Sequence, residues 1–421
     1  MRIGFEQKVI TPKLPCMLAG YAKQRTAEVV HDELYVKVVV FEQDEHYYAL
    51  LAYDLLAVDH LIMDAVKAKC AREVKIDHMF FSAIHTHSGP GGILDSEHGF
   101  LRGAKSLFGE TDSEYLEYVA VQSVEALKQA TLKLQAGSIK IAYGSCEGIG
   151  SNRNDQCLAG NSSLWLAEIC SDAGNALVAN FACHPTVLGA DNLAVSADFC
   201  GAYAQAMQEK GYAMCLFLNG SCGDISSRFT RAGNDFHEVR RMGELLALSS
   251  VSLLKQAMPW QENSISYAPL TAVLAAKKTK SIDEAEALLK QRQQQFQLAK
   301  TQPLSVSELR LIENGVEGAM ADYLYALHYD GTLTYEITVE MMKVGEEIFI
   351  GIPGELFSEL SNSYENEHTH FISYLNGYQM YFADAHAYEQ QFYEAFSSPF
   401  AKAESEKLMM LIDRQIKKWR E

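Results

Sequence analysis

Two histidines separated by one residue, His85 and His87, are the first side chains of this sequence that indicate a metal site. They follow the short apolar run 79–84, which is typical of a buried strand, and precede the glycine-rich segment 88–92. Side chains two positions apart on an extended backbone face the same way, so we expect both imidazoles on one side of a strand end. The segment 88–92 cannot continue a strand and lets a ligand approach the backbone.

The same His-x-His pattern occurs again at His368 and His370, so the pattern alone is not specific. The second copy lies in a polar stretch, and we favour the first because a buried strand and a glycine-rich turn surround it. Two families of His-x-His hydrolases do not fit. Metallo-β-lactamases continue the motif with Asp and His, whereas Ser88 follows here. Amidohydrolases place it on the first barrel strand, whereas strands precede it here.

Two further candidate ligands stand where predicted strands end. His184 ends an apolar strand and precedes Pro185, which favours an extended backbone at that point. Glu355 follows the predicted strand 347–352 and a Pro-Gly turn, and we expect it to begin a helix over 355–364. Taken alone, His184 is more typical of a buried structural histidine, and Glu355 is equally typical of a favourable charge in the first turn of a helix.

The elements that position these residues alternate between strands and helices. Strands are predicted at 36–42, 47–53, 79–84, 165–169, 176–183, 213–218, 335–344 and 347–352. Helices are predicted at 58–69, 115–132, 198–210, 236–256 and 402–420 as well as at 355–364. This order predicts an α/β fold with mixed β-sheets flanked by helices. No Pro- or Gly/Ser-rich linker divides the chain, so we expect one catalytic domain over 1–421. The polar segment 281–330 is either an inserted helical hairpin or a solvated face.

Composition narrows the classes of partner. The chain has 421 residues and a formal net charge of −18, which disfavours nucleic acids and anionic membrane surfaces as partners. No apolar run approaches the roughly 20 residues of a membrane-spanning helix, and the N-terminus lacks the apolar core of a signal peptide. The nine cysteines form no Cys-x-x-Cys pair, as expected for reduced thiols. We therefore predict a cytoplasmic protein.

Taken together, the motifs resemble the neutral/alkaline ceramidases, which are zinc amidases that release fatty acid from ceramide. The resemblance is in order along nearly the whole chain. It rests on the segments Ile-Thr-Pro at 10–12, Gly-Tyr-Ala at 20–22, His-Thr-His-Ser-Gly-Pro at 85–90, Phe-Ala-Cys-His-Pro at 181–185, Pro-Gly-Glu at 353–355 and the tyrosine-rich segment 376–394. The first His-x-His motif is the most specific of them.

The resemblance implies a zinc site and names its ligands as His85, His184, Glu355 and Tyr381. Two imidazoles and a carboxylate suit an open catalytic zinc site. A tyrosine ligand is unusual, and only the resemblance selects Tyr381 from the neighbouring tyrosines 374, 378, 388 and 393.

The resemblance also implies catalytic residues beside the metal. His87 would donate a proton or hold the attacking water. Arg153 and Tyr393 would donate hydrogen bonds to the carbonyl oxygen as negative charge develops on it. Ser226 would line the site rather than act as a nucleophile, since no Gly-x-Ser-x-Gly elbow is present. Asp198 is expected to contact one of the metal ligands and to orient it, without binding the metal itself.

The expected activity is zinc-dependent hydrolysis of an N-acyl bond by an activated water. Asn154 and Ser227 replace residues that are usual in the family. The substrate would therefore be either ceramide or another N-acyl compound. Secreted ceramidases carry an export signal and a C-terminal immunoglobulin-like domain, and we expect neither here. Two alternatives stay open: a zinc hydrolase of an ester or other acyl bond, and a metal-holding protein without turnover.

Overall fold

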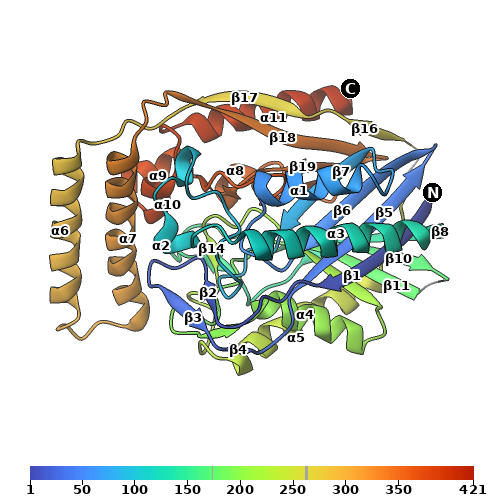
Figure 1. Ribbon diagram of the computed structural model, residues 1–421, viewed down its shortest axis with the longest axis horizontal. Coiled ribbons are helices and arrows are strands. Elements are labelled where there is room, and N and C mark those ends of the chain that lie inside the picture. The colour runs from blue at the N-terminus through green and yellow to red at the C-terminus, as the bar shows by residue number, and fades with distance from the viewer. Residues whose placement is uncertain (173, 261–263) are drawn as a thin grey trace.

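Two β-sheets form the centre of the computed structural model, which describes residues 1–172, 174–260 and 264–421 (Figure 1). Neighbouring strands of the larger sheet are antiparallel except for the pairs at its two ends, which are parallel. In order across this sheet, the described strands are β13 (Met214–Asn219), β11 (Gly174–Phe181), β10 (Ser163–Ser171), β8 (Gln135–Ser145), β1 (Arg2–Val9), β5 (Tyr35–Gln43), β6 (His46–Tyr53) and β7 (His78–Ala83), with β15 (Met258–Pro259) paired to β8.

The smaller sheet is built mainly from the C-terminal third of the chain. Its order is β16 (Ile265–Tyr267), β18 (Thr334–Val344), β19 (Glu347–Gly351) and β21 (Thr369–Ile372), with β17 (Leu270–Ala275) paired to β18. Short strands also form four separate pairs: β2 (Cys16–Leu18) with β3 (Arg25–Ala27), β4 (Val29–Val30) with β12 (Ala194–Val195), β9 (Ser151–Asn152) with β14 (Ile225–Ser226), and β20 (Glu355–Leu356) with β22 (Tyr381–Phe382).

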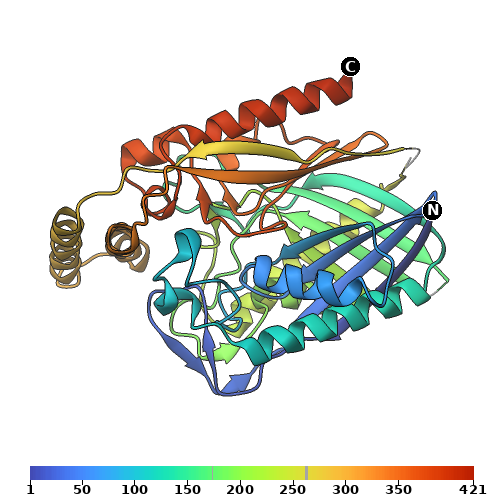
Figure 2. The same ribbon diagram turned by 45° about the horizontal axis from the view of Figure 1, so that its top comes forward.

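Helices cover both outer faces of the stacked sheets. Figure 2 shows α11 (Glu404–Arg420) lying along the outside of the smaller sheet. The outer face of the larger sheet is covered by α1 (His60–Cys70), α3 (Ser113–Leu132), α4 (Asp198–Glu209) and α5 (Phe236–Leu254). Shorter helices are η1 (Gly99–Leu101), α2 (Lys105–Phe108), α8 (Ser358–Ser361), α9 (Ala385–Gln390) and α10 (Tyr393–Ser397). The mixed α/β architecture predicted from the sequence is confirmed.

The pleat of the central strands divides the apolar side chains between two cores. In β5, Val38 and Val40 pack under the helices, while Val39 faces the core between the two sheets. The second core also contains Trp165 of the larger sheet, with Phe349 of the smaller sheet packed against it. Side chains alternate between the faces of a strand, so the near-continuous valine run of β5 reflects burial on both faces.

One predicted helix is wrong. The residues around Glu355 form the short strand β20, and the helix that follows is only α8. The backbone amide of Glu355 donates to the carbonyl of Met380 at 2.8 Å, and that of Phe357 to the carbonyl of Phe382 at 3.2 Å. These bonds to a distant segment replace the helical bonds that the local sequence favours, because tertiary contacts override weak local propensity.

The polar segment 281–330 folds into two helices, α6 (Ile282–Ala299) and α7 (Val306–His328), which stand side by side at one end of the molecule (Figure 1). Each begins with a reciprocal capping box, Ser281 with Glu284 and Ser305 with Glu308. The segment is therefore a helical hairpin. That it is an insertion into the fold stays a prediction.

The state of the cysteines and the character of the helices are both relevant to the predicted cytoplasmic location. All nine cysteines are free thiols. Within the described ranges, no helix combines the length and the apolar character that crossing a bilayer requires. A cytoplasmic location stays a prediction.

Candidate active site

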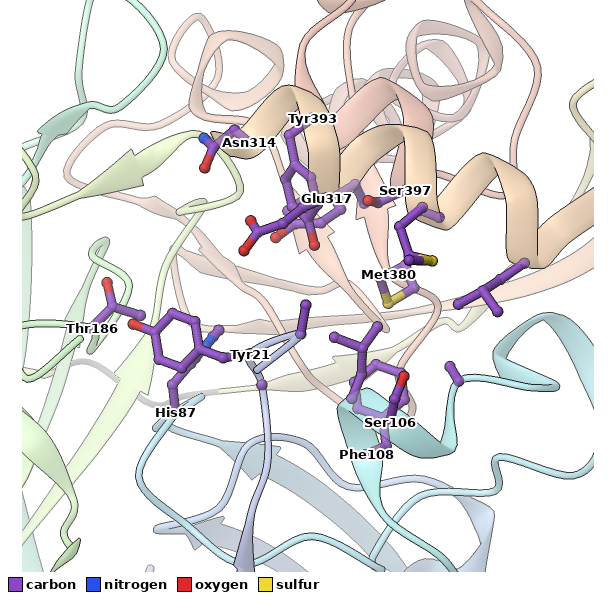
Figure 3. A pocket seen from close by; sticks show the side chains of 18 of the residues that line it. Tyr21, His87, Ser106, Phe108, Thr186, Asn314, Glu317, Met380, Tyr393 and Ser397 are labelled. Atoms are coloured by element: carbon purple, nitrogen blue, oxygen red, sulfur yellow. The ribbon is translucent and has the colours of Figure 1, made fainter. Parts of the chain in front are cut away.

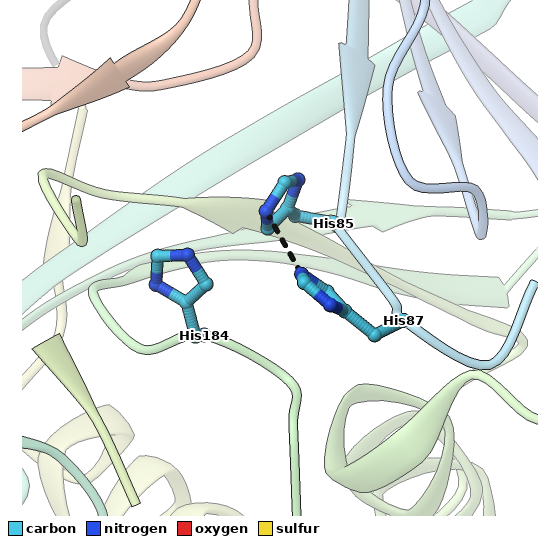
Figure 4. Close-up of side chains that lie close together, drawn as sticks. All are labelled: His85, His87 and His184. Carbon is cyan, nitrogen blue, oxygen red and sulfur yellow. Dashed lines mark hydrogen bonds between the residues drawn. The ribbon is translucent and has the colours of Figure 1, made fainter. Parts of the chain in front are cut away.

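The first His-x-His motif lies where the chain leaves β7, and its two imidazoles converge. The Nε2 atoms of His85 and His87 are 3.2 Å apart (Figure 4). The expected extended backbone is wrong at this point, because His85 has φ +71°, in the left-handed region. A non-glycine residue in that region carries strain that the surrounding structure must hold, and such strain is common at functional sites.

His184 joins this pair, and its Nδ1, like that of His85, faces a backbone carbonyl. One ring nitrogen from each of the three histidines lies within 4.8 Å of the others. Nδ1 of His85 is 2.8 Å from the carbonyl oxygen of Leu56, and Nδ1 of His184 is 2.7 Å from that of Cys222. A carbonyl oxygen only accepts, so both Nδ1 atoms carry the proton and both Nε2 atoms present a lone pair.

Burial keeps these two rings neutral. It lowers the pKa of His85 to about 3, against the opposing attraction of Glu355. It also lowers the pKa of His184 well below its ordinary value, and the charge of Arg153 adds to this effect. Neutral imidazoles with free Nε2 lone pairs are the form of histidine that binds metals.

The carboxylate of Glu355 faces the same point. Its Oε2 lies 2.9 Å from Nε2 of His184 and 3.7 Å from Nε2 of His85, while Oε1 accepts from the hydroxyl of Tyr378 at 2.6 Å. A neutral His184 whose proton is on Nδ1 cannot donate from Nε2. Two acceptor atoms at 2.9 Å require a proton or a cation between them, and the set of donors fits zinc.

Tyr381 is brought to Glu355 by backbone pairing. The two residues are register partners in the parallel strands β20 and β22. The Tyr381 hydroxyl accepts from Nη2 of Arg153 at 3.0 Å. Burial raises the pKa of Tyr381 well above its ordinary value, against the opposing effect of Arg153. In the absence of a metal, Tyr381 is therefore a neutral phenol.

His87 differs from the other two histidines in how it is held. Its Nδ1 is buried and has no hydrogen-bond partner in the structure. The ring packs edge-on against Tyr21 with centroids 4.9 Å apart, and Gly20 leaves it room, because a Cβ there would lie 2.6 Å from Nδ1. Burial and then the neighbouring His85 and His184 lower the pKa of His87 well below its ordinary value. Without a carbonyl to orient it, His87 fits proton transfer better than a fixed ligand.

A cavity of about 300 Å³ opens beside the histidines (Figure 3). All four predicted catalytic residues line it: His87, Arg153, Ser226 and Tyr393. Tyr381 lines it as well, whereas His85, His184 and Glu355 lie behind the wall. One face of α7 forms another wall through Arg310, Asn314, Glu317, Ala321 and Leu324, a spacing that places side chains on one side of a helix.

Arg153 and Tyr393 are prepared to donate hydrogen bonds into this cavity. Nε of Arg153 donates to Oε1 of Glu394 at 2.7 Å. Burial alone would lower the pKa of Arg153, but Tyr381 and Glu394 raise it well above its ordinary value. Burial also raises the pKa of Tyr393, so its phenol keeps its proton. Both groups can therefore face developing negative charge as donors.

Ser226 and Asp198 support the segments around His184. Ser226 lies in β14, next to His184 in an isolated parallel bridge, and its Oγ accepts from the backbone amide of Arg228 at 3.3 Å. The carboxylate of Asp198 accepts from the amides of Val187 at 3.3 Å and Leu188 at 3.2 Å. Burial raises the pKa of Asp198 to about 6. Asp198 therefore holds the loop after His184 rather than the imidazole itself.

Comparison with known families decides the relationship. A family model described as neutral/alkaline non-lysosomal ceramidase, N-terminal, matches residues 2–232, which is more than half of the chain. The chain belongs to this family. The resemblance predicted from the sequence is thereby confirmed. No curated protein matches the chain.

Solved ceramidase structures share the fold. The neutral ceramidase from Pseudomonas aeruginosa superposes with a TM-score of 0.75 at 16% identity, over 99% of this chain and 74% of that one. A structure described as ceramidase complexed with C2 gives a TM-score of 0.72 at 15% identity, with the same coverage. At such identities the likeness establishes the fold, and it confirms the predicted fold class.

The second His-x-His motif of this ceramidase-family chain has a structural partner. Nδ1 of His368 lies 2.8 Å from one oxygen of the buried Glu347, and Nε2 of His370 lies 2.6 Å from the other. Among the residues that the structure describes, the cluster of His85, His87 and His184 is the one group of three or more His, Cys, Asp or Glu side chains close enough to share an ion.

Sequence reasoning missed two residues of the site. Tyr378 holds Glu355, and Glu394 holds both Arg153 and, through Oε2, the side-chain amide of Asn154 at 3.1 Å. Both lie in the tyrosine-rich segment 376–394 that carries part of the family resemblance. The Asn154 contact also gives a role to a residue that departs from the usual family pattern.

Proposed function

We propose that this chain is a zinc-dependent amide hydrolase that cleaves the N-acyl bond of ceramide or of another N-acyl compound. One observation carries the proposal: the Nε2 lone pairs of His85 and His184 and the carboxylate of Glu355 converge behind the wall of a cavity. Membership of the ceramidase family supports the choice of an amide as the bond that is cleaved.

The residues present fit zinc as the metal. His85, His184 and Glu355 would hold it, with Tyr381 as the fourth protein ligand. Zinc held by nitrogen and oxygen ligands in an open site polarises a carbonyl oxygen and lowers the pKa of water to about 7. The carbonyls of Leu56 and Cys222 fix the imidazoles, and Tyr378 fixes the carboxylate, so the ligands are oriented before the metal binds.

The residues that line the cavity would carry out the remaining steps. Arg153 and Tyr393 donate hydrogen bonds to the carbonyl oxygen as the oxygen of a water adds to the carbonyl carbon. His87 accepts a proton from that water and returns it to the amide nitrogen as the carbon–nitrogen bond breaks. The products are a carboxylic acid and a free amine, which exchange the second proton of the water to become a carboxylate and an ammonium group, so atoms and protons balance. Ser226 shapes the cavity and takes no covalent part.

The proposed catalytic unit is the whole chain, 1–421. The ligand His85 and the base His87 come from the first third, Arg153 and His184 from the middle, and Tyr393 from near the end. The hairpin of α6 and α7 contributes a cavity wall, so it would belong to the same unit.

A matched pair of substrates tests the reaction class. The zinc-loaded protein is incubated with N-octanoyl sphingosine and with the octanoate ester of a simple alcohol, and release of octanoate is measured. Faster cleavage of the amide supports the proposal. Cleavage of the ester alone would replace it with an esterase, and no cleavage of any acyl compound in a wider panel would leave a metal-holding protein without turnover.

A further inference from the structure

The cavity carries positive charge in a chain that is otherwise strongly acidic. The formal net charge of the protein is −18, yet the charged side chains that line the cavity are mostly arginines. Among the described lining residues, these are Arg102, Arg153, Arg228, Arg231 and Arg310, against one carboxylate, that of Glu317. Ceramide is a neutral molecule, so binding it does not explain this charge.

Among the residues that the structure describes, three of these arginines form no ion pair: Arg102, Arg228 and Arg231, of which the last two contact residues of the site. Arg153 is paired with Glu394, and Arg310 donates to Glu317 at 2.9 Å. Among the residues that the structure describes, neither Arg228 nor Arg231 has a carboxylate within 4.0 Å. Arg228 donates instead to the backbone carbonyl of Arg153 at 2.7 Å. Arg231 donates to the carbonyls of Thr186 at 2.7 Å and Val187 at 2.9 Å.

A guanidinium placed away from water without a counter-charge is energetically unfavourable. Burial, together with the charges of Arg153 and Arg310, lowers the pKa of Arg228 to about 9. With the amide of Asn314 oriented so that its oxygen faces Arg228, that oxygen accepts from Nη2 at 3.1 Å. The contacts of Arg228 thus fix its position but supply no negative charge. An anion in the cavity would supply it.

The opposite side of the cavity is apolar. Figure 3 shows Thr186 and Asn314 on one side, and Phe108 and Met380 on the other. The larger apolar side chains that line the cavity are Leu101, Leu107, Phe108, Met320, Leu324 and Met380. The volume of about 300 Å³ lies at the small end of the range for ligand pockets. The cavity therefore suits a compact molecule with one apolar end and one anionic end.

We propose that the amide cleaved at this site carries an anionic group on its amine side, a carboxylate or a phosphate, which binds to Arg228 and Arg231 while the acyl chain lies against the apolar wall. Arginine recognises both anions through paired N–H donors, so the chemistry is the same for either source. Both arginines are tied by backbone contacts to residues of the site, Arg228 to Arg153 and Arg231 to Thr186. The anion would thus be held next to the reacting carbonyl. This proposal rests on the proposed amide hydrolase function.

Three amides with the same acyl chain test it: N-octanoyl glycine, N-octanoyl phosphoethanolamine and the neutral N-octanoyl ethanolamine. The zinc-loaded protein should cleave at least one charged amide with a kcat/KM about tenfold or more above that of the neutral one. The better of the two charged amides identifies the anion. In Arg228→Gln and Arg231→Gln, the ratio of charged to neutral kcat/KM should fall about tenfold to a hundredfold, mainly through KM for the charged amide.

An exposed arginine that does not line the cavity provides the matched control. Arg72→Gln removes the same charge and should leave the ratio unchanged. Circular dichroism and zinc content of each variant separate a lost contact from a lost fold. A neutral amide cleaved as well as the charged ones, or a ratio that survives in both cavity variants, would overturn this inference and leave the hydrolase proposal standing.

If none of the three amides is cleaved, calorimetry with N-octanoyl glycine still decides the point. Binding that weakens about tenfold or more in Arg228→Gln supports the anion site even though the proposed reaction has failed. No binding to the wild-type protein would contradict the anion site as well.

Discussion

Glu355 and Tyr381 are direct partners in the parallel pairing of β20 and β22. The pairing is made by backbone hydrogen bonds, including the bond from the amide of Glu355 to the carbonyl of Met380. It places the two proposed oxygen ligands side by side although they belong to separate segments of the chain. The position of Tyr381 beside Glu355 thus follows from strand pairing.

Replacement of Tyr381 by phenylalanine should weaken zinc binding at least tenfold and lower the rate of amide cleavage. The reason is that the phenol is proposed as a zinc ligand. Even residues that only hydrogen-bond to a metal ligand contribute about tenfold to a hundredfold to metal affinity. Competition with a fluorescent chelator measures the affinity. Tyr388→Phe is the control, since its hydroxyl donates to the carbonyl of Phe400 at 2.7 Å and not to the site. Equal zinc affinity in both variants would remove Tyr381 from the ligand set.

His87 and His85 should respond differently to substitution. We expect His87→Gln to keep zinc and to lose about a hundredfold to ten-thousandfold in kcat, the usual range for a group that transfers protons. His85→Ala should lose zinc and activity together, because His85 is anchored with Nε2 toward Glu355. Metal content and kcat are measured on the same preparations. Loss of zinc from His87→Gln would make His87 a ligand.

The sequence predicts those parts of this site that depend on neighbouring residues, and it does not predict those that depend on contacts between distant segments. His85 and His184 stand directly after strands whose apolar runs are visible in the sequence, and both strands are found where they were predicted. The convergence of their side chains depends on the left-handed backbone of His85 and on a carbonyl from another segment. Neither feature has a signature in the residues themselves, and only the family resemblance joined these histidines into one site.

Gly20→Ala should reduce kcat about tenfold or more while zinc stays bound. A Cβ at this position would lie 2.6 Å from Nδ1 and 2.7 Å from Cγ of His87, so the ring must move, and small displacements of reacting groups have large effects on rate. Gly211→Ala is a matched control, because Gly211 has φ +98° against +95° for Gly20 but has nothing within 4 Å of the new atom. The same loss of kcat in both variants would point to backbone strain rather than to His87.

Lys277 should make stability depend on pH above neutrality. Nζ of Lys277 donates to Asp322 at 3.1 Å and lies 4.0 Å from the ring centre of Tyr325. Burial lowers its pKa from 10.5 to about 8. Between these two pH values the unfolded chain binds a proton at Lys277 that the folded protein does not, so the free energy of unfolding should rise with pH. The slope is about 1.4 kcal/mol per pH unit for one proton.

The variant Lys277→Met isolates this contribution. It removes the titrating group, and Asp322 keeps its contact with Lys280. Urea unfolding of both proteins at pH 7.5, 8.5 and 9.5 gives the difference in unfolding free energy, which should move in favour of the wild type as pH rises through about 8. A difference that stays constant over this range would mean that Lys277 keeps an ordinary pKa.

The fold shows the same contrast between elements set by neighbouring residues and elements set by pairing with a distant segment. Strands β5 and β6 were predicted, because β-rich apolar runs flank a short charged turn. In the structure they pair as a hairpin, and the turn residues Asp44 and Glu45 both have positive φ. The helix predicted after Pro353 was wrong, because β20 pairs with β22. The face of α7 that lines the cavity is also invisible in a sequence whose composition equally suits a solvated helix.

The zinc content of the purified protein tests the central claim most directly. Mass spectrometry of the wild-type protein after zinc loading and removal of excess metal should give about one zinc per chain, and none in the double variant His85→Ala, His184→Ala. A wild-type protein that holds no zinc under these conditions, or a double variant that holds a full equivalent, would contradict the assignment of this site.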